Sequence, residues 1–284
     1  LTEEQAAAAP ESFKTVAAKG KEFAGKLYRM QVSPLDCTGC GNCVDVCLGK
    51  CLTMEPLSEQ KAEEANWEYA QTIPEVDSTI LNKANVKESQ FLKPLFEFSG
   101  ACAGCGETPY VKLLTQLFGD KMFLANATGC TQAWGAAMPC VPYCKNKEGK
   151  GPAWSNSLFE NNAEFSYGMC LAVKQLRAAV TDYVHQLDDI TENAAVKAAI
   201  AKWLETYDDL DASTPATQEL LHLLESQSFS AQEQALVDEI LKRRKDMSKK
   251  TMWMYGGDGW AYDIGYGGLD HVFAMGEDVN VLLV

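Results

Sequence analysis

The sequence predicts an α/β fold that follows part of a small cysteine-rich module. Three features predict it. Residues 35–51 hold five cysteines, the apolar stretches at 121–126 and 251–255 each lead into a glycine-containing turn, and segments with helical spacing alternate with these stretches. Short strands, glycine-rich turns and helices in alternation are typical of α/β proteins.

Length, composition and charge narrow the class of protein. The chain has 284 residues, of which 46% are hydrophobic, and a formal net charge of −14. Such an acidic chain is expected to repel nucleic acid, and it has no apolar run of about 18 residues that would predict a membrane span. The first residues lack the pattern of a signal peptide, so a cytoplasmic location is expected. In that reducing compartment the 11 cysteines are expected to bind metal rather than form disulfides.

The densest cysteine motif has the spacing Cys37-x2-Cys40-x2-Cys43-x3-Cys47. This run is found in bacterial ferredoxins, where the first three thiolates hold one 4Fe–4S cluster and the fourth binds the other cluster. Structural zinc is the alternative, but its ligands usually come as two pairs with a short spacer, and the next pair lies far downstream. The motif departs from the ferredoxin pattern at Leu48, where proline is usual.

The segments around this motif complete the first prediction of domains. Residues 35–60 are expected to form half of a 4Fe–4S ferredoxin domain, and residues 28–33 and 51–57 the short strands that bracket its cluster loop. Residues 1–34 are expected to be an N-terminal linker. The polar residues 61–92 are expected to form a connector on the surface.

Residues 93–284 carry the α/β pattern. Apolar residues recur at helical spacing over 109–118, between a first-turn proline and a terminating glycine, and this pattern predicts a helix. The apolar stretch at 121–126 predicts the strand that follows it. The region of about 186–247 is expected to hold two or three amphipathic helices, which form a helical insertion.

The segment 251–284 repeats the strand–turn–helix pattern. A strand at 251–255 ends at Gly256-Gly257-Asp258-Gly259, and a helix near 267–275 and a strand at 279–284 follow. Glycines at the carboxyl end of a strand allow a diphosphate to approach the backbone, and an Asp among them can hold a divalent metal. A tight turn with a capping Asp is the alternative interpretation, and the tetrapeptide alone leaves both open.

Both ends of the chain suggest a piece of a longer polypeptide. The chain opens on Leu1 rather than on Met, and its last residues, "VNVLLV", have the pattern of a buried strand with no polar tail. We therefore expect further parts of a parent chain on either side.

With these features in view, the chain resembles the pyruvate:ferredoxin oxidoreductase family, including its flavodoxin-dependent relatives. The resemblance covers essentially the whole chain and includes "YRMQVSPLDCTGCGNCVDVC", "ACAGCGETPYVKLLTQLFGD" and "GDGWAYDIGYGGLDHV". It implies a thiamine-diphosphate-binding three-layer α/β domain over 93–284, and oxidative decarboxylation of pyruvate to acetyl-coenzyme A. It also implies 4Fe–4S clusters, thiamine diphosphate and Mg²⁺ as cofactors, ferredoxin or flavodoxin as electron acceptor, and a homodimer of the full enzyme.

The resemblance also assigns residues. Cys102, Cys105 and Cys130 resemble three ligands of the cluster nearest the thiamine, whose fourth ligand would lie beyond Val284. Glu107 and Cys130 match positions that contact thiamine diphosphate. The catalytic groups that hold the 2-oxoacid are expected in domains outside these 284 residues.

The glycine-rich loop after 251–255 matches the diphosphate-binding loop of the family. Gly257, Asp258, Gly259 and Trp260 occupy its cofactor-binding positions, and Asp258 matches the magnesium ligand.

Four cysteines have no role in this scheme. They are Cys51, Cys140, Cys144 and Cys170. Packing is the expected role of Cys51, and Cys140 and Cys144 are not expected to be cluster ligands.

Three other functions remain open from the sequence. A non-catalytic iron–sulfur electron-transfer protein would explain residues 35–57 but not the Gly-Asp-Gly segment. A thiamine enzyme without redox chemistry would leave the many cysteines unexplained. A related 2-oxoacid:ferredoxin oxidoreductase with another 2-oxoacid would share most of the motifs.

Overall fold

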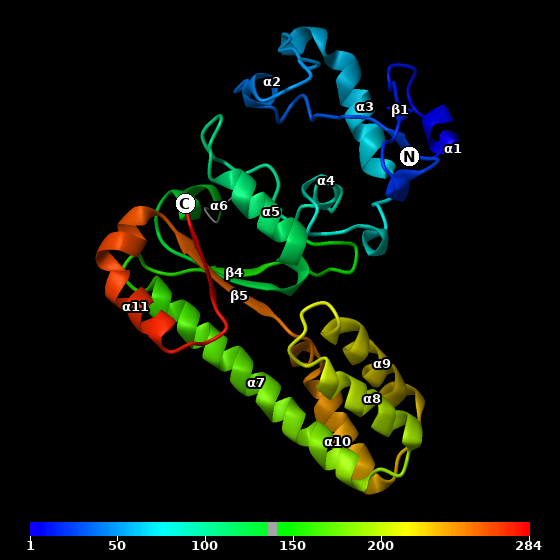
Figure 1. Ribbon diagram of the computed structural model, residues 1–284, viewed down its shortest axis with the longest axis vertical. Coiled ribbons are helices and arrows are strands. Elements are labelled where there is room, and N and C mark those ends of the chain that lie inside the picture. The colour runs from blue at the N-terminus through cyan, green and yellow to red at the C-terminus, as the bar shows by residue number, and fades with distance from the viewer. Residues whose placement is uncertain (136–140) are drawn as a thin grey trace. The chain divides into compact units, whose positions relative to one another are not determined.

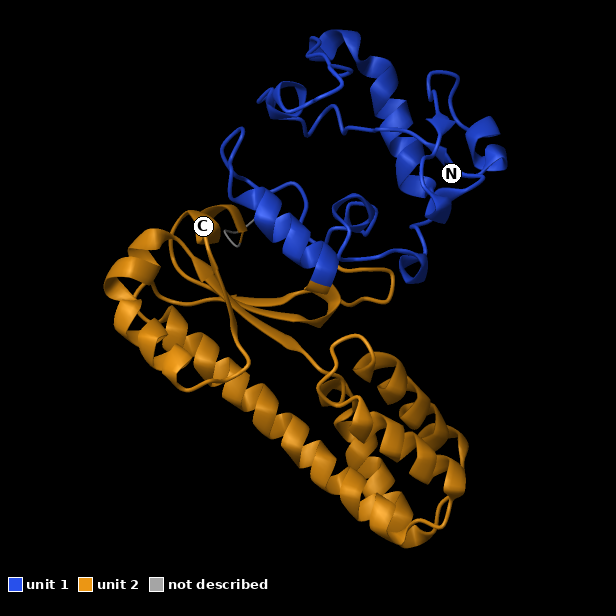
Figure 2. Ribbon diagram, viewed as in Figure 1, with its two compact units in different colours: residues 1–117 blue, residues 118–284 orange. Residues whose placement is uncertain are grey.

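The computed structural model describes residues 1–135 and 141–284 and divides the chain into two compact units. The first unit comprises residues 1–117 and the second residues 118–284 (Figure 2). This boundary differs from the predicted one near residue 92, because Leu92 and Leu117 pack together in the core of the first unit with Phe23 and Leu81.

The first unit is built from short elements joined by loops (Figure 1). These are α1 (Glu3–Ala7), β1 (Val16–Ala17), β2 (Leu27–Tyr28), α2 (Asn42–Asp45), α3 (Lys61–Thr72), α4 (Val86–Ser89) and α5 (Thr108–Phe118), whose last residue belongs to the second unit. The helix predicted at 109–118 is therefore confirmed as α5.

The two strands predicted around the cysteine motif do not form. β2 reaches only to Tyr28 and pairs with β1, and residues 51–57 form no strand. Side-chain contacts hold the backbone after β2 instead. The Arg29 guanidinium pairs with the Glu63 carboxylate of α3 at 2.7 Å, and Gln31 Nε2 donates to the same oxygen at 3.0 Å. The segment thus follows α3 rather than a second strand.

The predicted surface connector contributes to the interior of the first unit. Its residues 61–72 form α3, in which Asn66 is fully buried and accepts a hydrogen bond from Ser12 Oγ at 2.9 Å. The Tyr69 ring of the same helix meets the buried Phe13 ring edge to face, with 5.3 Å between centroids. The polar composition of the segment did not predict these contacts, because only one face of the helix makes them.

The second unit contains a parallel sheet within its described residues. The strand order is β4 (Ala153–Asn156), β3 (Met122–Asn126), β5 (Thr251–Gly256), β6 (Asn280–Leu283), with Asn126 opposite Asn156 on one side and Tyr255 on the other. The strands predicted at 121–126, 251–255 and 279–284 are confirmed, as is the α/β class.

Two helices cover one face of this sheet. These are the first turns of α7 (Asn162–Ile190) and α11 (Tyr266–Ala274), which contact each other (Figure 1). Buried Met254, Trp260, Leu269 and Ala163 form the core between these helices and the sheet. This core lies directly beneath the glycine-rich segment that follows β5.

The predicted helical insertion is confirmed and has a core of its own. It consists of α8 (Ala194–Glu205), α9 (Ser213–Ser226) and α10 (Ala231–Lys242), which pack with the second half of α7 around the fully buried Trp203. We call this part the bundle. At 29 residues, α7 is about 43 Å long and runs from the sheet into the bundle (Figure 1).

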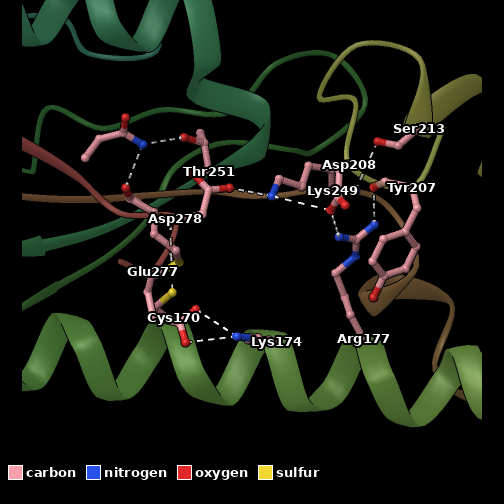
Figure 3. Close-up of polar contacts among 12 residues, drawn as sticks. Cys170, Lys174, Arg177, Tyr207, Asp208, Ser213, Lys249, Thr251, Glu277 and Asp278 are labelled. Atoms are coloured by element: carbon pink, nitrogen blue, oxygen red, sulfur yellow. Dashed lines mark hydrogen bonds and ion pairs between the residues drawn. The ribbon is translucent and has the colours of Figure 1, made fainter. Parts of the chain in front are cut away.

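Polar contacts join α7, the bundle and the segments that lead into β5 and β6 (Figure 3). Arg177 Nη2 donates to the Tyr207 carbonyl at 2.6 Å, and its guanidinium lies over the Tyr207 ring at 3.7 Å. Lys174 Nζ pairs with the Glu277 carboxylate at 2.9 Å, and Lys249 pairs with Asp278. Lys249 also lies 3.9 Å from the Asp208 carboxylate, so the loop between α8 and α9 contacts the segment that leads into β5.

Among the helices that the structure describes, none is long and apolar enough to span a membrane.

Candidate functional site

The carboxyl ends of β3 and β5 lie side by side at the centre of the sheet. Ala127 N–H, just after β3, donates to the Tyr255 carbonyl of β5 at 2.9 Å. From β3 the chain passes first to β4 on one side, and the later strands β5 and β6 lie on the other side. Loops that leave neighbouring strands at such a switch point form the usual ligand site of an open α/β sheet.

The glycine-rich segment forms the β5 side of this site. A Cβ on Gly256 would lie 2.6 Å from the Ala127 Cβ, and one on Gly265 would lie 2.5 Å from the Trp260 ring. The residues Gly259–Ile264 form a π-helix that buries Trp260 completely. Asp258 immediately precedes this helix, and its side chain is exposed. The strand, turn and buried tryptophan therefore leave a carboxylate accessible at the edge of the sheet.

Buried polar atoms without a described partner lie in the same region. Three buried side-chain atoms make no hydrogen bond within the described residues: Asn126 Oδ1, Trp260 Nε1 and Tyr255 Oη. Asn126 ends β3, and its amide nitrogen donates to Asn156 Oδ1 at 3.2 Å. The sequence analysis did not single out Asn126. The signal that could have found it is a polar Asn as the last residue of an otherwise apolar strand.

Cys130 lies on the β3 side of this sheet edge. Gly129 has a φ of 148°, a value that an L side chain adopts rarely, and it leads into α6 (Cys130–Gly135). The Ala133 N–H donates to the Gly129 carbonyl at 3.0 Å, which begins that helix. The Cys130 side chain is exposed, so the thiol is available to a ligand at the same edge as Asp258.

The ferredoxin-like motif forms an exposed loop in the first unit. The side chains of Cys37, Cys40 and Cys43 are exposed. Gly39 and Gly41 have φ values of 69° and 82°, so both adopt the left-handed conformation that glycine favours. The loop therefore has the accessible thiols and the glycine-containing turns that a cluster would need.

Cys47 and Cys51 lie in contact at the end of this loop. Their sulfur atoms are 3.4 Å apart, and the Cys51 N–H donates to Cys47 Sγ. Hydrogen bonds from the Cys51 backbone and thiol lower the pKa of Cys47, and the same side-chain contact raises the pKa of Cys51. Cys51 is exposed, so the expectation of a packing role for it is wrong.

The second CxxC motif forms a tight turn in the first unit. Cys105 N–H donates to the Cys102 carbonyl at 3.0 Å, and Gly104 has a φ of 76°. A Cβ on Gly104 would lie 3.5 Å from the Cys40 Cβ, so the two cysteine loops of this unit approach each other. Glu107 is half-buried and immediately precedes α5.

The predicted cluster ligands are not gathered into finished sites. Within residues 1–135 and 141–284, no group of three or more His, Cys, Asp or Glu side chains is arranged to hold a metal ion. Cys102 and Cys105 belong to the first unit and Cys130 to the second. The donor chemistry fits iron–sulfur ligation, since thiolates are the ligands of such clusters.

The remaining cysteines differ in burial. Cys170 of α7 is buried, and its burial raises the pKa of the thiol. Cys144 is half-buried. Cys140 lies outside the described residues.

A pocket in the first unit was not predicted from the sequence. It has a volume of about 500 Å³ and is lined by Trp67, Phe96 and Phe98 together with Glu97 and Lys112. Partial burial raises the pKa of the Glu97 carboxyl and lowers the pKa of the Lys112 amine. The residues come from α3, the 96–99 segment and α5, so no single stretch of sequence signals them.

Comparison with known proteins relates the chain to large oxidoreductases, although no family model matches it. It is 54% identical to "Pyruvate:ferredoxin oxidoreductase" of Moorella thermoacetica over 98% of this chain and 24% of that protein. The corresponding identity to "Pyruvate-flavodoxin oxidoreductase" of Enterobacter agglomerans is 47%, over 100% of the chain and 24% of the relative. For "Pyruvate dehydrogenase [NADP(+)]" of Cryptosporidium parvum it is 44%, over 97% of the chain and 16% of the relative.

These matches confirm the resemblance seen in the motifs, and they span about a quarter of the length of the first two relatives. Identity of this level along the whole chain is not produced by isolated cysteine or glycine motifs. The chain belongs to the pyruvate:ferredoxin/flavodoxin oxidoreductase family, of which it represents one segment.

Proposed function

We propose that this chain is part of an enzyme that oxidatively decarboxylates pyruvate, forms acetyl-coenzyme A and passes electrons to ferredoxin or flavodoxin. The observation that carries the proposal is the meeting of the Cys130 and Asp258 turns at one edge of the sheet, in a chain related along its whole length to such enzymes. A thiol and a carboxylate at that edge suit an iron–sulfur cluster beside a diphosphate cofactor that carries a metal ion.

The second unit, with the end of the first, is the proposed thiamine-diphosphate-binding three-layer domain. Thiamine diphosphate, when bound, supplies the electron sink for decarboxylation. Gly257 and Gly259 are half-buried and carry no side chain that would keep a diphosphate from the backbone after β5, and Trp260 is the buried anchor of that loop. Asp258 offers its exposed carboxylate to Mg²⁺, whose charge would offset that of the diphosphate. Glu107 is proposed to contact the same cofactor.

The cysteines are proposed to hold 4Fe–4S clusters that carry electrons outward. Cys37, Cys40 and Cys43 are the proposed ligands of an outer cluster, and residues 35–60 the proposed half of a ferredoxin domain. Cys47 is the proposed ligand of a further cluster of that domain. The fit rests on exposed thiols and on the left-handed Gly39 and Gly41, which let the backbone wrap a cluster.

An inner cluster is proposed at Cys102, Cys105 and Cys130. The approach of Gly104 to Cys40 supports a path between it and the outer cluster, because the two loops lie side by side in the first unit. Coenzyme A and a homodimer of the full enzyme in the cytoplasm belong to the same proposal.

Replacement of Asp258 tests the assignment of the metal ligand. In the full-length enzyme, Asp258→Asn should weaken thiamine diphosphate binding in the presence of Mg²⁺, because a charged contact contributes about 1.5–3 kcal/mol. Isothermal titration should show an affinity about tenfold to a hundredfold lower. Iron content should not change, because the cluster thiolates are untouched.

Asp263→Asn is the matched control. Asp263 is an exposed carboxylate in the same π-helix as Trp260 and is not assigned to the cofactor. Equal loss of affinity in both variants, or none in Asp258→Asn, would rule out Asp258 as the magnesium ligand.

A further inference from the structure

Cys47 and Cys51 form a close pair of thiols on the surface of the first unit. Their sulfurs are 3.4 Å apart, and the Cys51 N–H donates to Cys47 Sγ at 3.4 Å. Cys51 is exposed and Cys47 is half-exposed, so small oxidants can reach both. The ferredoxin spacing uses Cys47 but has no use for Cys51, which leaves the second thiol of the pair without a function.

A local turn holds the two thiols together. Lys50 N–H donates to the Cys47 carbonyl at 3.0 Å, and Lys50 has a φ of 48°, an unusual value for a residue other than glycine. Between them Leu48 is fully exposed and packs against nothing that would resist movement. The remaining approach to a sulfur–sulfur bond of about 2.05 Å therefore requires adjustment only within one exposed turn.

We propose that Cys47 and Cys51 form a reversible disulfide whenever Cys47 is not bound to iron, and that this bond withholds Cys47 from a cluster. The second half of the proposal rests on the proposed role of Cys47 as a ligand. The pair then acts as a redox-sensitive site, which protects the thiol of a cluster-free chain from irreversible oxidation and releases it on reduction.

A hydroperoxide is a sufficient oxidant for this step. The Cys47 sulfur attacks one oxygen of hydrogen peroxide, the O–O bond breaks, and Cys47 becomes a sulfenic acid as one water leaves. The Cys51 sulfur then attacks the Cys47 sulfur, the S–O bond breaks, and a second water leaves as the disulfide forms. The two thiols lose two electrons and two protons, and the peroxide is reduced to two waters. A dithiol reverses the reaction by exchange.

Peptide mapping of the oxidised full chain tests the pair directly. Iron is first removed with a chelator in the absence of oxygen, one equivalent of hydrogen peroxide is added, and the remaining thiols are alkylated. Trypsin cleaves after Lys50, so the disulfide would join peptide 30–50 to peptide 51–61, and mass spectrometry would detect the linked product. We expect most of Cys51 in this product and its loss after treatment with dithiothreitol.

Three variants make the test specific. Cys47→Ser and Cys51→Ser should each reduce the linked product by about tenfold or more, because the effective concentration of the neighbouring thiol is lost. Cys43→Ser is the matched control, since Cys43 lies four residues before Cys47 on the same peptide, and it should keep the product. Alkylated Cys51 in the oxidised wild type, or equal loss of the product in Cys43→Ser, would overturn the proposal.

Reconstitution with iron separates this proposal from the proposed function. After the same peroxide treatment, Cys51→Ser should regain more iron than the wild type, and dithiothreitol should remove the difference. If the linked product forms but peroxide-treated wild type and Cys51→Ser regain equal iron, the withholding of Cys47 is disproved. If the fully reduced full-length enzyme binds no iron at all, the proposed cluster role of Cys47 fails, whereas the disulfide is judged by the peptide map alone.

Discussion

The ring of Trp260 occupies the space that side chains on Gly256 and Gly265 would need. A Cβ on Gly256 would lie 2.9 Å from this ring, and one on Gly265 only 2.5 Å. The two glycines therefore serve packing beneath the loop, whereas Gly257 and Gly259 remain the positions where a diphosphate could approach. The glycines of this segment thus meet two separate requirements, close packing against Trp260 and access for a diphosphate. The neighbours of each glycine show which requirement applies to it.

Glu97 gives the first unit a pH-dependent contribution to stability. Burial raises the pKa of its carboxyl, while Lys93 and Lys112 act in the opposite direction. The folded state therefore keeps the proton at pH values where the unfolded chain has lost it, and the free energy of unfolding falls as pH rises through that window. Glu97→Gln should remove this fall. The variant should gain stability relative to wild type as pH rises above the ordinary pKa of a glutamate carboxyl, about 4.3, by less than about 1 kcal/mol because the group is partly exposed.

Urea unfolding of both proteins across this range checks the prediction. Glu68→Gln, an exposed carboxylate on α3, provides the control and should show no such trend. A stability difference for Glu97→Gln that shrinks as pH rises would contradict the assigned direction.

The outcome for single residues shows where sequence reasoning works. Asp258 was singled out because it stands among glycines after a predicted strand, whereas Cys130 was assigned only through the family resemblance. Parallel neighbouring strands place the turns that carry them at one edge of the sheet. Cys51 was misjudged as a packing residue, because burial depends on contacts that spacing does not report. Glu97 and Lys112 were missed, since the pocket they line assembles from distant segments.

Among the elements, α7 connects two cores that share no residue. Met254 and Trp260 belong to the core beneath the sheet, whereas Trp203 and Leu220 belong to the core of the bundle. The amphipathic pattern of the insertion was enough to predict its helices. It did not predict that they enclose a second core, because the pattern gives one apolar face per helix and not its partner.

Trp203 should therefore control the stability of the bundle more than that of the sheet. Its side chain is fully buried, and its Nε1 donates to Thr217 Oγ1 at 3.1 Å. Trp203→Ala should cost about 3–5 kcal/mol, since it leaves a large cavity and an unpaired hydroxyl. Hydrogen exchange should increase in α8, α9 and α10 and change little in β3 and β5.

Trp203→Phe serves as the comparison, because it keeps most of the apolar volume and should cost less. Equal loss of protection in the sheet and the bundle would show that the two cores unfold together.

For the molecule as a whole, the proposal shares each cofactor site between this chain and other parts of the full-length enzyme. Within the described residues no group of three or more His, Cys, Asp or Glu side chains is arranged to hold a metal ion, and a site shared with other domains loses affinity steeply when one wall is absent. The 284-residue chain purified alone in air should therefore carry neither stoichiometric 4Fe–4S clusters nor thiamine diphosphate. Iron analysis and cofactor extraction would check this expectation. About eight irons per chain, the content of two complete clusters, would contradict it.

The continuity of α7 has a consequence for the evolution of this segment. The chain enters the bundle through one long helix and returns to β5 after α10, so residues between Ile190 and Thr251 can change in number without moving any strand. Homologous chains should accordingly concentrate their insertions and deletions in the loops of the bundle. The turn between Tyr255 and Trp260, where glycines and a tryptophan interlock, should keep a constant length.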